Sequence, residues 1–160
     1  MKKAQHYNGE EITPLWVYWN PNPLNKRTGD CVIRAISKAT GKPWADLLRE
    51  MTEWLIPRGE VFDEKAGFGP YLEEVLHFQK MRMPKHADGT SYPLWEFLNG
   101  AQRNFHIIVQ VRNHLTYVFN GQFYDIWDCT NKCVYNFWLK PSKSFYGERR
   151  SQTNPQATRS

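Results

Sequence analysis

The sequence predicts a single α+β domain, with helices in its first two thirds and an antiparallel β-sheet in its last third. Three observations predict this fold class. Apolar residues recur at helical spacing between residues 31 and 98, β-branched and aromatic residues form short runs from Phe105 onward, and Asn120-Gly121 separates two of these runs. An Asn-Gly pair between apolar runs is the strongest short-range signal for a β-hairpin. A chain of 160 residues, of which 41% are hydrophobic, is sized for one core.

The two ends of the chain carry weaker patterns. Residues 16–19 predict a short extended segment, which a Pro- and Asn-rich turn at residues 20–23 brings to an end. Beyond residue 146 the apolar pattern stops and small, polar and charged residues take over. We therefore expect one domain over residues 1–146 and a disordered tail over residues 147–160.

The first helix is expected to begin after Asp30, whose side chain can cap it, and to end at Gly41. The second helix is expected over residues 44–55, with Pro43 in its first turn, and it ends before Pro57. Apolar side chains of this second segment form one stripe, as in a helix packed on a core.

A third and a fourth helix are predicted over residues 70–78 and 93–98. Each starts with a proline, which is favoured at the first helical position because its missing N–H is unpaired there in any case. Between them, residues 81–92 predict a surface loop rich in Pro, Asp and Gly.

From Phe105 the apolar pattern changes from helical spacing to strand runs. The two runs beside Asn120-Gly121 are expected to form a hairpin with a two-residue turn. The expected strands cover residues 105–111, 115–119, 123–127 and 134–139.

The net charge and the number of cysteines limit the classes of function that the protein can have. A net charge of +5 suits an acidic partner, but Lys and Arg are spread along the chain without a block, so we expect no nucleic-acid binding. Three cysteines, an odd number, and no apolar signal segment after Met1 predict free thiols in the cytoplasm. No apolar run approaches the ~20 residues that a membrane-spanning helix needs, so no membrane partner is expected.

Cys31 is the candidate nucleophile. A thiol attacks as the thiolate, and the unpaired N–H groups at a helix N-terminus favour that charged form. The neighbouring Asp30 opposes this effect, so a cationic imidazole is also needed to hold the thiolate. The alternative is that Cys31 is a small buried apolar residue.

His114 is the candidate base and Asp125 the carboxylate that orients it. With a two-residue turn, Thr116 lies opposite Asp125 in the neighbouring strand. Side chains alternate between the faces of a sheet, so His114, Thr116 and Asp125 face the same side, with Asp125 diagonal to His114. The alternative interpretation of His114 is an exposed turn histidine.

Two other residues compete for these roles. Asp128 is the alternative acid, but it faces the opposite side of the sheet unless a bulge intervenes. His106 is the alternative base, although its place in an apolar run favours an interior histidine with a hydrogen-bond partner.

A zinc site is not expected. Cys129 and Cys133 are four residues apart beside a turn, but the sequence holds no second ligand pair of a known structural type. His86, far off in the sequence, is the one plausible additional ligand. We therefore expect no metal and no other cofactor.

Three segments together resemble a known family. They are Gly29-Asp30-Cys31-Val-Ile-Arg-Ala-Ile, His114-Leu-Thr-Tyr-Val with Asn120-Gly121, and Tyr124-Asp125-Ile-Trp-Asp128-Cys. In their order and in the arrangement of helices before a sheet, these segments resemble the small papain-like cysteine peptidases of bacteriophage and mobile bacterial DNA. The resemblance extends from about residue 25 to residue 138.

The resemblance implies a papain-like fold, in which the helix that carries Cys31 packs on the sheet. It implies a triad of Cys31, His114 and Asp125 that hydrolyses peptide or isopeptide bonds, or transfers the acyl group to another acceptor. An amide side chain six residues before the cysteine completes the oxyanion hole in this family. Asn25, shorter than the usual Gln, holds that position here, and Asn22 is the second candidate.

The resemblance implies a protein or peptide substrate, which for a phage-encoded enzyme includes the proteins of the host. A second interpretation has the same fold without catalysis, as a binding or inhibitory module that acts on a host protein.

Overall fold

The computed structural model describes residues 5–7, 10–12 and 14–142 of the chain. These residues form helices and a six-stranded sheet, which confirms the predicted α+β class. The tail predicted over residues 147–160 lies outside the described residues. In the described part of the chain, no helix combines the length and the apolar character needed to cross a membrane.

Three strands precede the helical segments and one strand, β4 (Gln79–Arg82), lies among them, an order that the sequence does not predict. The helical segments are α1 (Cys31–Thr40), α2 (Trp44–Leu55), the 3-10 helix η1 (Ile56–Arg58), α3 (Lys65–Pro70), the π-helix η2 (Tyr71–Val75) and α4 (Leu94–Gly100). The strands are β1 (Gln5–Tyr7), β2 (Glu10–Ile12), β3 (Trp16–Tyr18), β4 (Gln79–Arg82), β5 (Phe105–Val111), β6 (His114–Phe119), β7 (Gln122–Asp125) and β8 (Asn136–Pro141).

The large sheet has the strand order β3-β7-β6-β5-β8-β4, and β1 pairs with β2 in a separate hairpin. Four of its neighbouring pairs are antiparallel, but β3 runs parallel to β7. The prediction of a purely antiparallel sheet is therefore wrong at this edge. The segment predicted as merely extended joins the sheet because its backbone pairs with β7, Trp16 opposite Phe123 and Tyr18 opposite Asp125.

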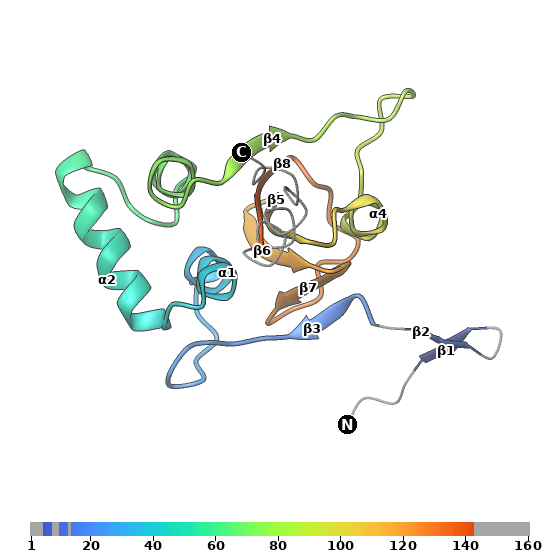
Figure 1. Cartoon of the computed structure of the whole chain (residues 1–160), viewed down its shortest axis with the longest axis horizontal. Helices are drawn as coiled ribbons and strands as arrows, with labels where there is room; N and C mark the ends of the chain where they lie inside the picture. Colours follow the sequence, from blue (N-terminus) through green and yellow to red (C-terminus); the bar gives the residue numbers. More distant parts are fainter. Residues whose placement is uncertain (1–4, 8–9, 13, 143–160) are drawn as a thin grey trace, which may run out of the picture.

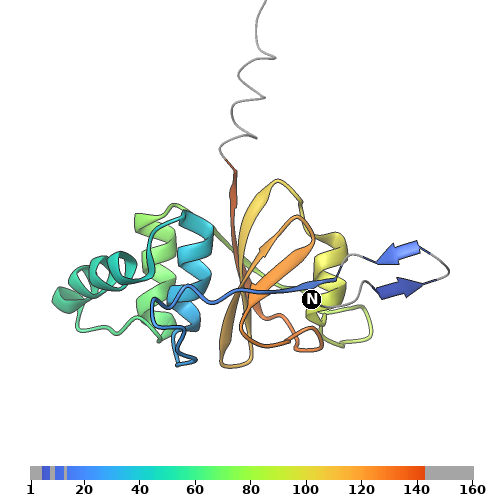
Figure 2. The ribbon, with the colours of Figure 1, turned by 90° about the horizontal axis from the view of Figure 1, so that it is seen from below.

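The sheet stands between two helical layers of unequal size (Figures 1 and 2). The helices α1, α2 and α3 lie on one side, and α4 lies on the other. On the α1 side, Ile33 and Ile36 share a buried cluster with Ile108, Tyr117 and Trp138 of the sheet. A second buried cluster on the α4 side joins residues of α4 to the opposite face of β5, β6 and β7.

The helix α1 forms where the sequence predicts it. Val32, Ile33 and Ile36 recur at helical spacing and are all buried against the sheet or α2. Gly41 ends the helix in the left-handed conformation with φ of 73°, and its N–H donates to the Ser37 carbonyl. This conformation suits glycine because a side chain at positive φ meets the backbone.

The third helical segment begins earlier than the sequence predicts. We expected a helix over residues 70–78 with Pro70 in its first turn, but Pro70 is the last residue of α3, within a helical run that starts at Lys65. Proline has no N–H and its ring crowds the carbonyl four residues earlier, so it disturbs the regular ladder. The chain continues as one π turn, in which the Leu76 N–H donates to the Tyr71 carbonyl over 3.2 Å.

The strands match the prediction except at their ends. The expected loop over residues 81–92 begins as the last residues of β4, which pairs with β8. The strand expected to reach residue 127 ends at Asp125, and the strand expected over residues 134–139 runs from Asn136 to Pro141.

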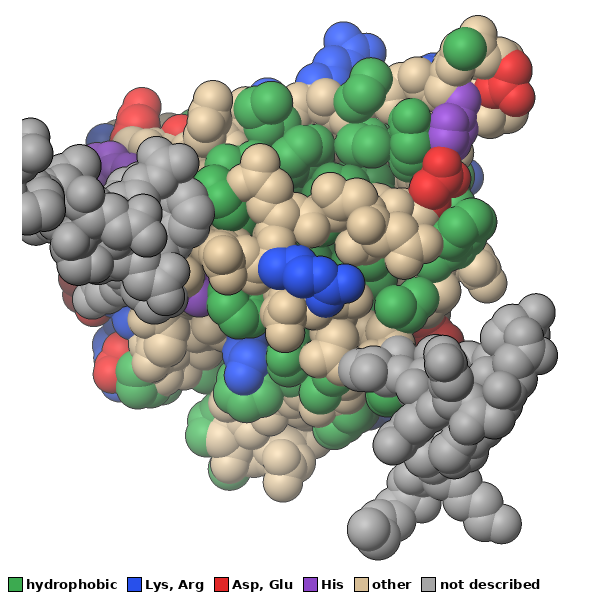
Figure 3. All heavy atoms as spheres, turned by 45° about the vertical axis from the view of Figure 1, so that its right-hand side comes forward, with side chains coloured by type: hydrophobic (Ala, Val, Ile, Leu, Met, Phe, Trp, Pro, Cys, Tyr) green, Lys and Arg blue, Asp and Glu red, His purple; other side chains and the backbone are tan. Residues whose placement is uncertain are grey.

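An apolar cavity of about 380 Å³ lies between α4 and the β4 and β8 edge of the sheet. Its walls include Met83, Phe97, Phe137 and Leu139. Figure 3, in which the α4 side comes forward, shows hydrophobic side chains among polar ones on this side of the molecule.

Gly67 of α3 gives a test of how closely the helical layer is packed. A Cβ atom at Gly67 would lie 2.0 Å from the Val61 carbonyl oxygen, which is backbone and cannot swing away. We expect Gly67→Ala to lower the free energy of unfolding by about 1–3 kcal/mol, as overpacked core positions do. Urea denaturation measures this change.

The matched control is Gly100→Ala, because nothing lies within 4 Å of a Cβ at Gly100, the last residue of α4. Alanine is the better helix former, so Gly100→Ala should leave the stability unchanged or raise it by up to about 1 kcal/mol. Equal losses in the two variants would contradict the close approach of α3 to residue 61.

Candidate active site

Cys31 is the first residue of α1, and its side chain is partly buried against the sheet. Burial alone would raise the pKa of the Cys31 thiol. Hydrogen bonds to His114 and from the Leu115 backbone, with the charges of His114 and Arg34, outweigh this effect and lower the pKa. A lowered pKa increases the fraction of Cys31 present as the thiolate, which is the nucleophilic form of cysteine.

His114 and Asp125 meet across the β6–β7 hairpin as the sequence predicts. The strand register places Tyr117 opposite Tyr124, so Asp125 lies diagonal to His114. The Nε2 atom of His114 lies 2.5 Å from Oδ2 of Asp125, and the two side chains are only 8% and 2% exposed. The predicted contact is thus present, and it is shielded from water.

The pKa of His114 is raised to about 11. Burial alone would lower it, but hydrogen bonds to Asp125, Cys129 and Cys31 and the negative charge of Asp125 more than offset burial. The raised pKa of His114 and the lowered pKa of Cys31 both favour the charged forms, an imidazolium at His114 and a thiolate at Cys31.

The Asp125 carboxylate has several partners besides His114. Its Oδ1 atom accepts a hydrogen bond from the Ile126 N–H over 2.7 Å and lies 3.3 Å from a guanidinium nitrogen of Arg34. Burial would raise the pKa of Asp125, yet the hydrogen bonds of His114 and Thr116 and the charges of His114 and Arg34 lower it. Asp125 therefore stays ionised inside the protein.

Asp128, the alternative acid, is occupied elsewhere. It is exposed, and its Oδ1 atom accepts hydrogen bonds from the backbone N–H and the hydroxyl of Thr130. These bonds close a turn after β7. Asp125, and not Asp128, is the carboxylate on the His114 ring.

Arg34 is a buried member of the site that the sequence did not predict. It is 3% exposed, pairs with Asp30 one helical turn earlier, and also reaches Asp125. The Trp44 indole N–H donates to the other oxygen of Asp30 over 2.8 Å. An arginine among the apolar residues of α1, four residues after an aspartate, was the available signal.

This arrangement corrects the expected role of Asp30. Asp30 does stand at the N-cap position of α1, but its side chain makes no capping hydrogen bond, because Arg34 and Trp44 bind both of its oxygens. The negative charge that was expected to oppose a Cys31 thiolate is thus neutralised by Arg34.

Trp127 and Cys129 also contact His114. The Trp127 ring lies 4.6 Å from the imidazole, centre to centre, at an interplanar angle of 57°. Cys129 is 1% exposed and hydrogen-bonds to His114, while burial raises the pKa of its thiol. The sequence places Trp127 at the end of an expected strand and offers Cys129 only as a zinc ligand, so neither contact with His114 was predicted.

His114, Asp125 and Cys129 bring three potential metal-ligand atoms within 4.8 Å of one another. This group differs from the pair of cysteines considered from the sequence. The nitrogen and oxygen of His114 and Asp125 are joined directly at 2.5 Å, so an ion bound to both would have to separate them. His86, the other ligand considered, instead lies 3.0 Å from a Glu96 carboxylate oxygen.

The residues considered for the oxyanion hole lie in the loop before α1. Asn25 is exposed and adopts a left-handed conformation with φ of 54°, and its N–H donates to the Asn22 carbonyl. The Asn22 side chain is buried, and its oxygen accepts a hydrogen bond from the Leu24 N–H. The oxyanion role of Asn25 stays a prediction.

His106 is an interior histidine with a partner, as the sequence favours. Its Nδ1 atom lies 2.7 Å from the Tyr117 hydroxyl, and its ring stacks on Phe119. Burial lowers the pKa of His106, and the nearby charge of Lys140 adds to the effect.

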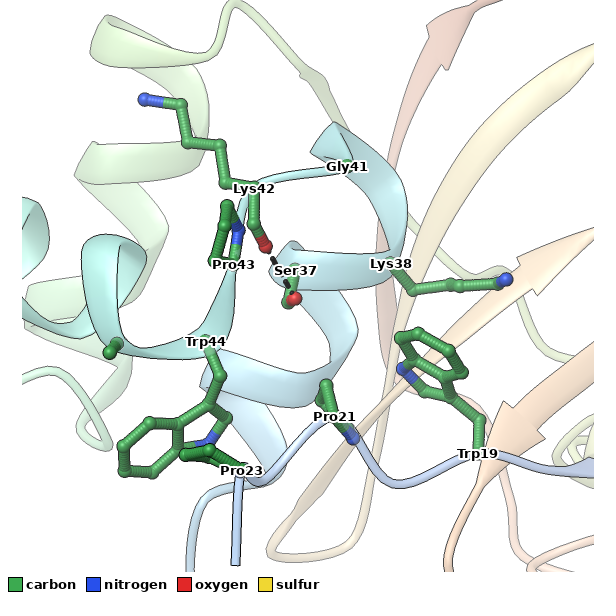
Figure 4. Close-up of a pocket in the computed structure, with 10 residues that line it drawn as sticks. Trp19, Pro21, Pro23, Ser37, Lys38, Gly41, Lys42, Pro43 and Trp44 are labelled. Atoms are coloured by element: carbon green, nitrogen blue, oxygen red, sulfur yellow. Dashed lines mark hydrogen bonds between the residues drawn. The ribbon is translucent and has the colours of Figure 1, made fainter.

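A cavity of about 440 Å³ lies beside the C-terminal half of α1, with Trp19 and Trp44 on its walls (Figure 4). Lys38 reaches over the Trp19 ring at 4.4 Å, and the Ser37 hydroxyl donates to the Lys42 carbonyl over 2.7 Å. Through its bond to Asp30, Trp44 links this cavity to the ion pairs behind Cys31.

Comparisons with protein-family models, with curated proteins and with solved structures each returned no match to this chain.

The paired charges of Cys31 and His114 predict an unequal reactivity of the cysteines. At pH 6, iodoacetamide should alkylate Cys31 much faster than Cys129, because the pKa of Cys31 is lowered whereas that of Cys129 is raised. Mass spectrometry of digested protein measures both rates, with Cys133 as an internal reference. His114→Ala should slow Cys31 at this pH, and equal rates before and after that change would contradict an activated thiol.

Arg34 should stabilise the fold because it is paired with two buried carboxylates. We expect Arg34→Met to lower the free energy of unfolding by about 3–5 kcal/mol, the usual cost of leaving a buried charge without its partner. Urea unfolding followed by tryptophan fluorescence measures this loss.

Glu50→Gln is the control, since it removes the exposed pair of Lys42 and Glu50, a kind of pair worth about 1 kcal/mol or less. If Arg34→Met lowered the free energy of unfolding no more than Glu50→Gln does, the buried ion pairs of Arg34 would not stabilise the fold around the site.

Proposed function

We propose that the protein is a cysteine peptidase, or an acyl-transfer enzyme of the same mechanism, with Cys31 as its nucleophile. The observation that carries the proposal is the hydrogen-bonded series of Cys31, His114 and Asp125 at the N-terminal end of α1. The lowered pKa of Cys31 and the raised pKa of His114 are what a nucleophile and its general acid require.

In the first half of the reaction, the Cys31 thiolate attacks the carbonyl carbon of a peptide or isopeptide bond. The C–N bond breaks, the protonated His114 gives its proton to the leaving amine, and the acyl group stays on sulfur as a thioester. In the second half, His114 takes a proton from water, which attacks the thioester and releases the acid and the thiolate. An amine in place of water would make the reaction a transfer.

The neighbours of His114 support these steps. Asp125 binds Nε2, so Nδ1 is the nitrogen that remains to exchange a proton with sulfur. Asp125 is in turn fixed by Arg34 and the Ile126 N–H. Trp127 lies against the imidazole and limits the access of water to it.

The oxyanion of the tetrahedral intermediate would form beside the start of α1. The Cys31 N–H belongs to the first turn of this helix, whose N–H groups favour negative charge. Asn25 is our candidate for the second donor, because the preceding loop that carries it leads directly to Cys31.

We also propose that the fold is papain-like, with a helix that carries the nucleophile packed on a sheet that carries the base and the acid. The three cysteines are free, which fits a reducing compartment such as a bacterial cytoplasm. The proposed substrate is a protein or peptide, and for a phage protein it would belong to the host.

Labelling with a peptidyl vinyl sulfone tests this function, because the probe reacts with a thiolate next to a proton donor. We expect the label on Cys31 alone. His114→Ala and Asp125→Asn should slow labelling by at least about a hundredfold and about tenfold, respectively, since general acid–base catalysis contributes roughly 10²–10⁴.

Asp128→Asn is the matched control, because Asp128 lies three residues after Asp125 and its carboxylate binds Thr130 and not His114. It should label at the rate of the unaltered protein. A labelling rate that does not change in His114→Ala, or a label found on Cys133, would favour the non-catalytic binding module instead.

A further inference from the structure

Two adjoining cavities form a basic groove along one end of the sheet, where β4 and β5 end and β6 and β8 begin. Their volumes are about 740 and 370 Å³, and they share Lys65, Tyr135 and Asn136 as lining residues. In the described chain, no Asp or Glu lines either cavity. The basic residues of this groove are Lys65, Lys80, Arg82, Lys85 and Arg112.

The cations of the basic groove have no acidic partner among the described residues. Of the residues that the structure describes, none forms an ion pair with any of these five cations. By contrast, Lys42 and Arg49 of the helical layer pair with Glu50 and Asp46. An unneutralised group of like charges along a cavity attracts a ligand of the opposite charge.

The basic groove leads to the candidate active site. Leu115, Gln110, Asn136 and Arg82 lie opposite one another in β6, β5, β8 and β4, so these positions form one row across one face of the sheet. The row begins at Leu115, whose backbone hydrogen-bonds Cys31. With strands about 4.8 Å apart, Arg82 is roughly 14 Å from Leu115, the reach of about four extended residues.

A second link joins the basic groove to the base. The turn between β5 and β6 consists of Arg112 and Asn113, and it lines the smaller cavity. The next residue is His114. A chain bound in the groove therefore passes Arg112 at the point where it reaches the candidate active site.

The floor of the basic groove suits a peptide. The Asn136 amide donates to the Gln110 side-chain oxygen over 2.9 Å, and Tyr135 is 46% exposed beside them. These amides present uncharged donors and acceptors of the kind that bind a peptide backbone. The five cations of the groove then favour a peptide with acidic side chains.

We propose that the basic groove binds an acidic segment of the polypeptide substrate and thereby presents the adjoining bond to Cys31. The inference deepens the proposed function and rests on it for the cleavage step. The binding of the acidic segment does not depend on catalysis and is tested separately.

The test uses the full chain with Cys31→Ala, so that no probe is cleaved, and a fluorescein-labelled glutamate-rich peptide. Fluorescence anisotropy should show binding that is at least about tenfold tighter than that of the matching glutamine-rich peptide. Added salt should weaken it, because the Debye length falls from about 10 Å at 0.1 M to about 3 Å at 1 M.

Lys80→Gln with Arg82→Gln should raise the Kd for the glutamate peptide by at least about tenfold. The control is Arg49→Gln with Arg58→Gln, an equal loss of charge on exposed side chains of α2 and η1. The control pair should bind as the parent does. Circular dichroism of both pairs verifies that they are folded.

Three results would overturn the proposal: equal binding of the glutamate and glutamine peptides, equal effects of the two variant pairs, or tighter binding of a single-stranded DNA of matched length. The last result would assign the groove to nucleic acid. Vinyl sulfone labelling of Cys31 in the chain with an intact groove separates these outcomes from the proposed function. If that chain labels normally but its Cys31→Ala variant does not bind the acidic peptide, the groove proposal alone fails.

Discussion

The carboxylate of Asp125 holds the helical and sheet layers together at one point. One of its oxygens binds His114 of β6, and the other binds Arg34 of α1. The backbone carbonyl of Asp125 accepts hydrogen bonds from the Trp16 indole and the Trp19 N–H, and these bonds hold the β3 segment against β7. A buried carboxylate without such partners would take up a proton or disrupt the fold, so the positions of all these groups depend on one another.

The buried charged side chains next to the candidate active site are paired with one another through Arg34. Asp30 and Asp125 are both within reach of Arg34, and neither is more than 3% exposed. Replacing such a group with apolar residues is often neutral or stabilising, so its presence needs a reason other than stability. Here the group fixes the orientation of His114 through Asp125 and cancels the charge next to Cys31.

Local patterns in the sequence were sufficient for much of this structure. Helical spacing located α1 and α2, and Asn120-Gly121 fixed the register of the hairpin, from which the contact of Asp125 with His114 follows by counting. The parallel pairing of β3 was not predictable in this way, because three residues of extended chain carry no information on which strand they join.

Arg34 and Pro70 show the other limit of local patterns. The partners of Arg34 include Asp125, which lies 91 residues away in the sequence, so its burial depends on tertiary structure. Pro70 was expected to begin a helix, yet packing of Phe68 and Tyr71 on either side into the core holds the helical run together through it. In both cases a long-range contact overrode the local preference.

The candidate active site takes its nucleophile from one layer and its base from the other, and this has a consequence for folding. In the unfolded chain, long loop closures must occur before His114 can approach Cys31, and such closures come at a cost in entropy. Until the layers have docked, the thiol has neither its imidazole nor its helix terminus and behaves as an ordinary cysteine. If Cys31 is the nucleophile proposed above, newly synthesised chains are spared its reactivity until they fold, and the thiol reactivity expected at acidic pH would report on the fraction of molecules that have completed folding.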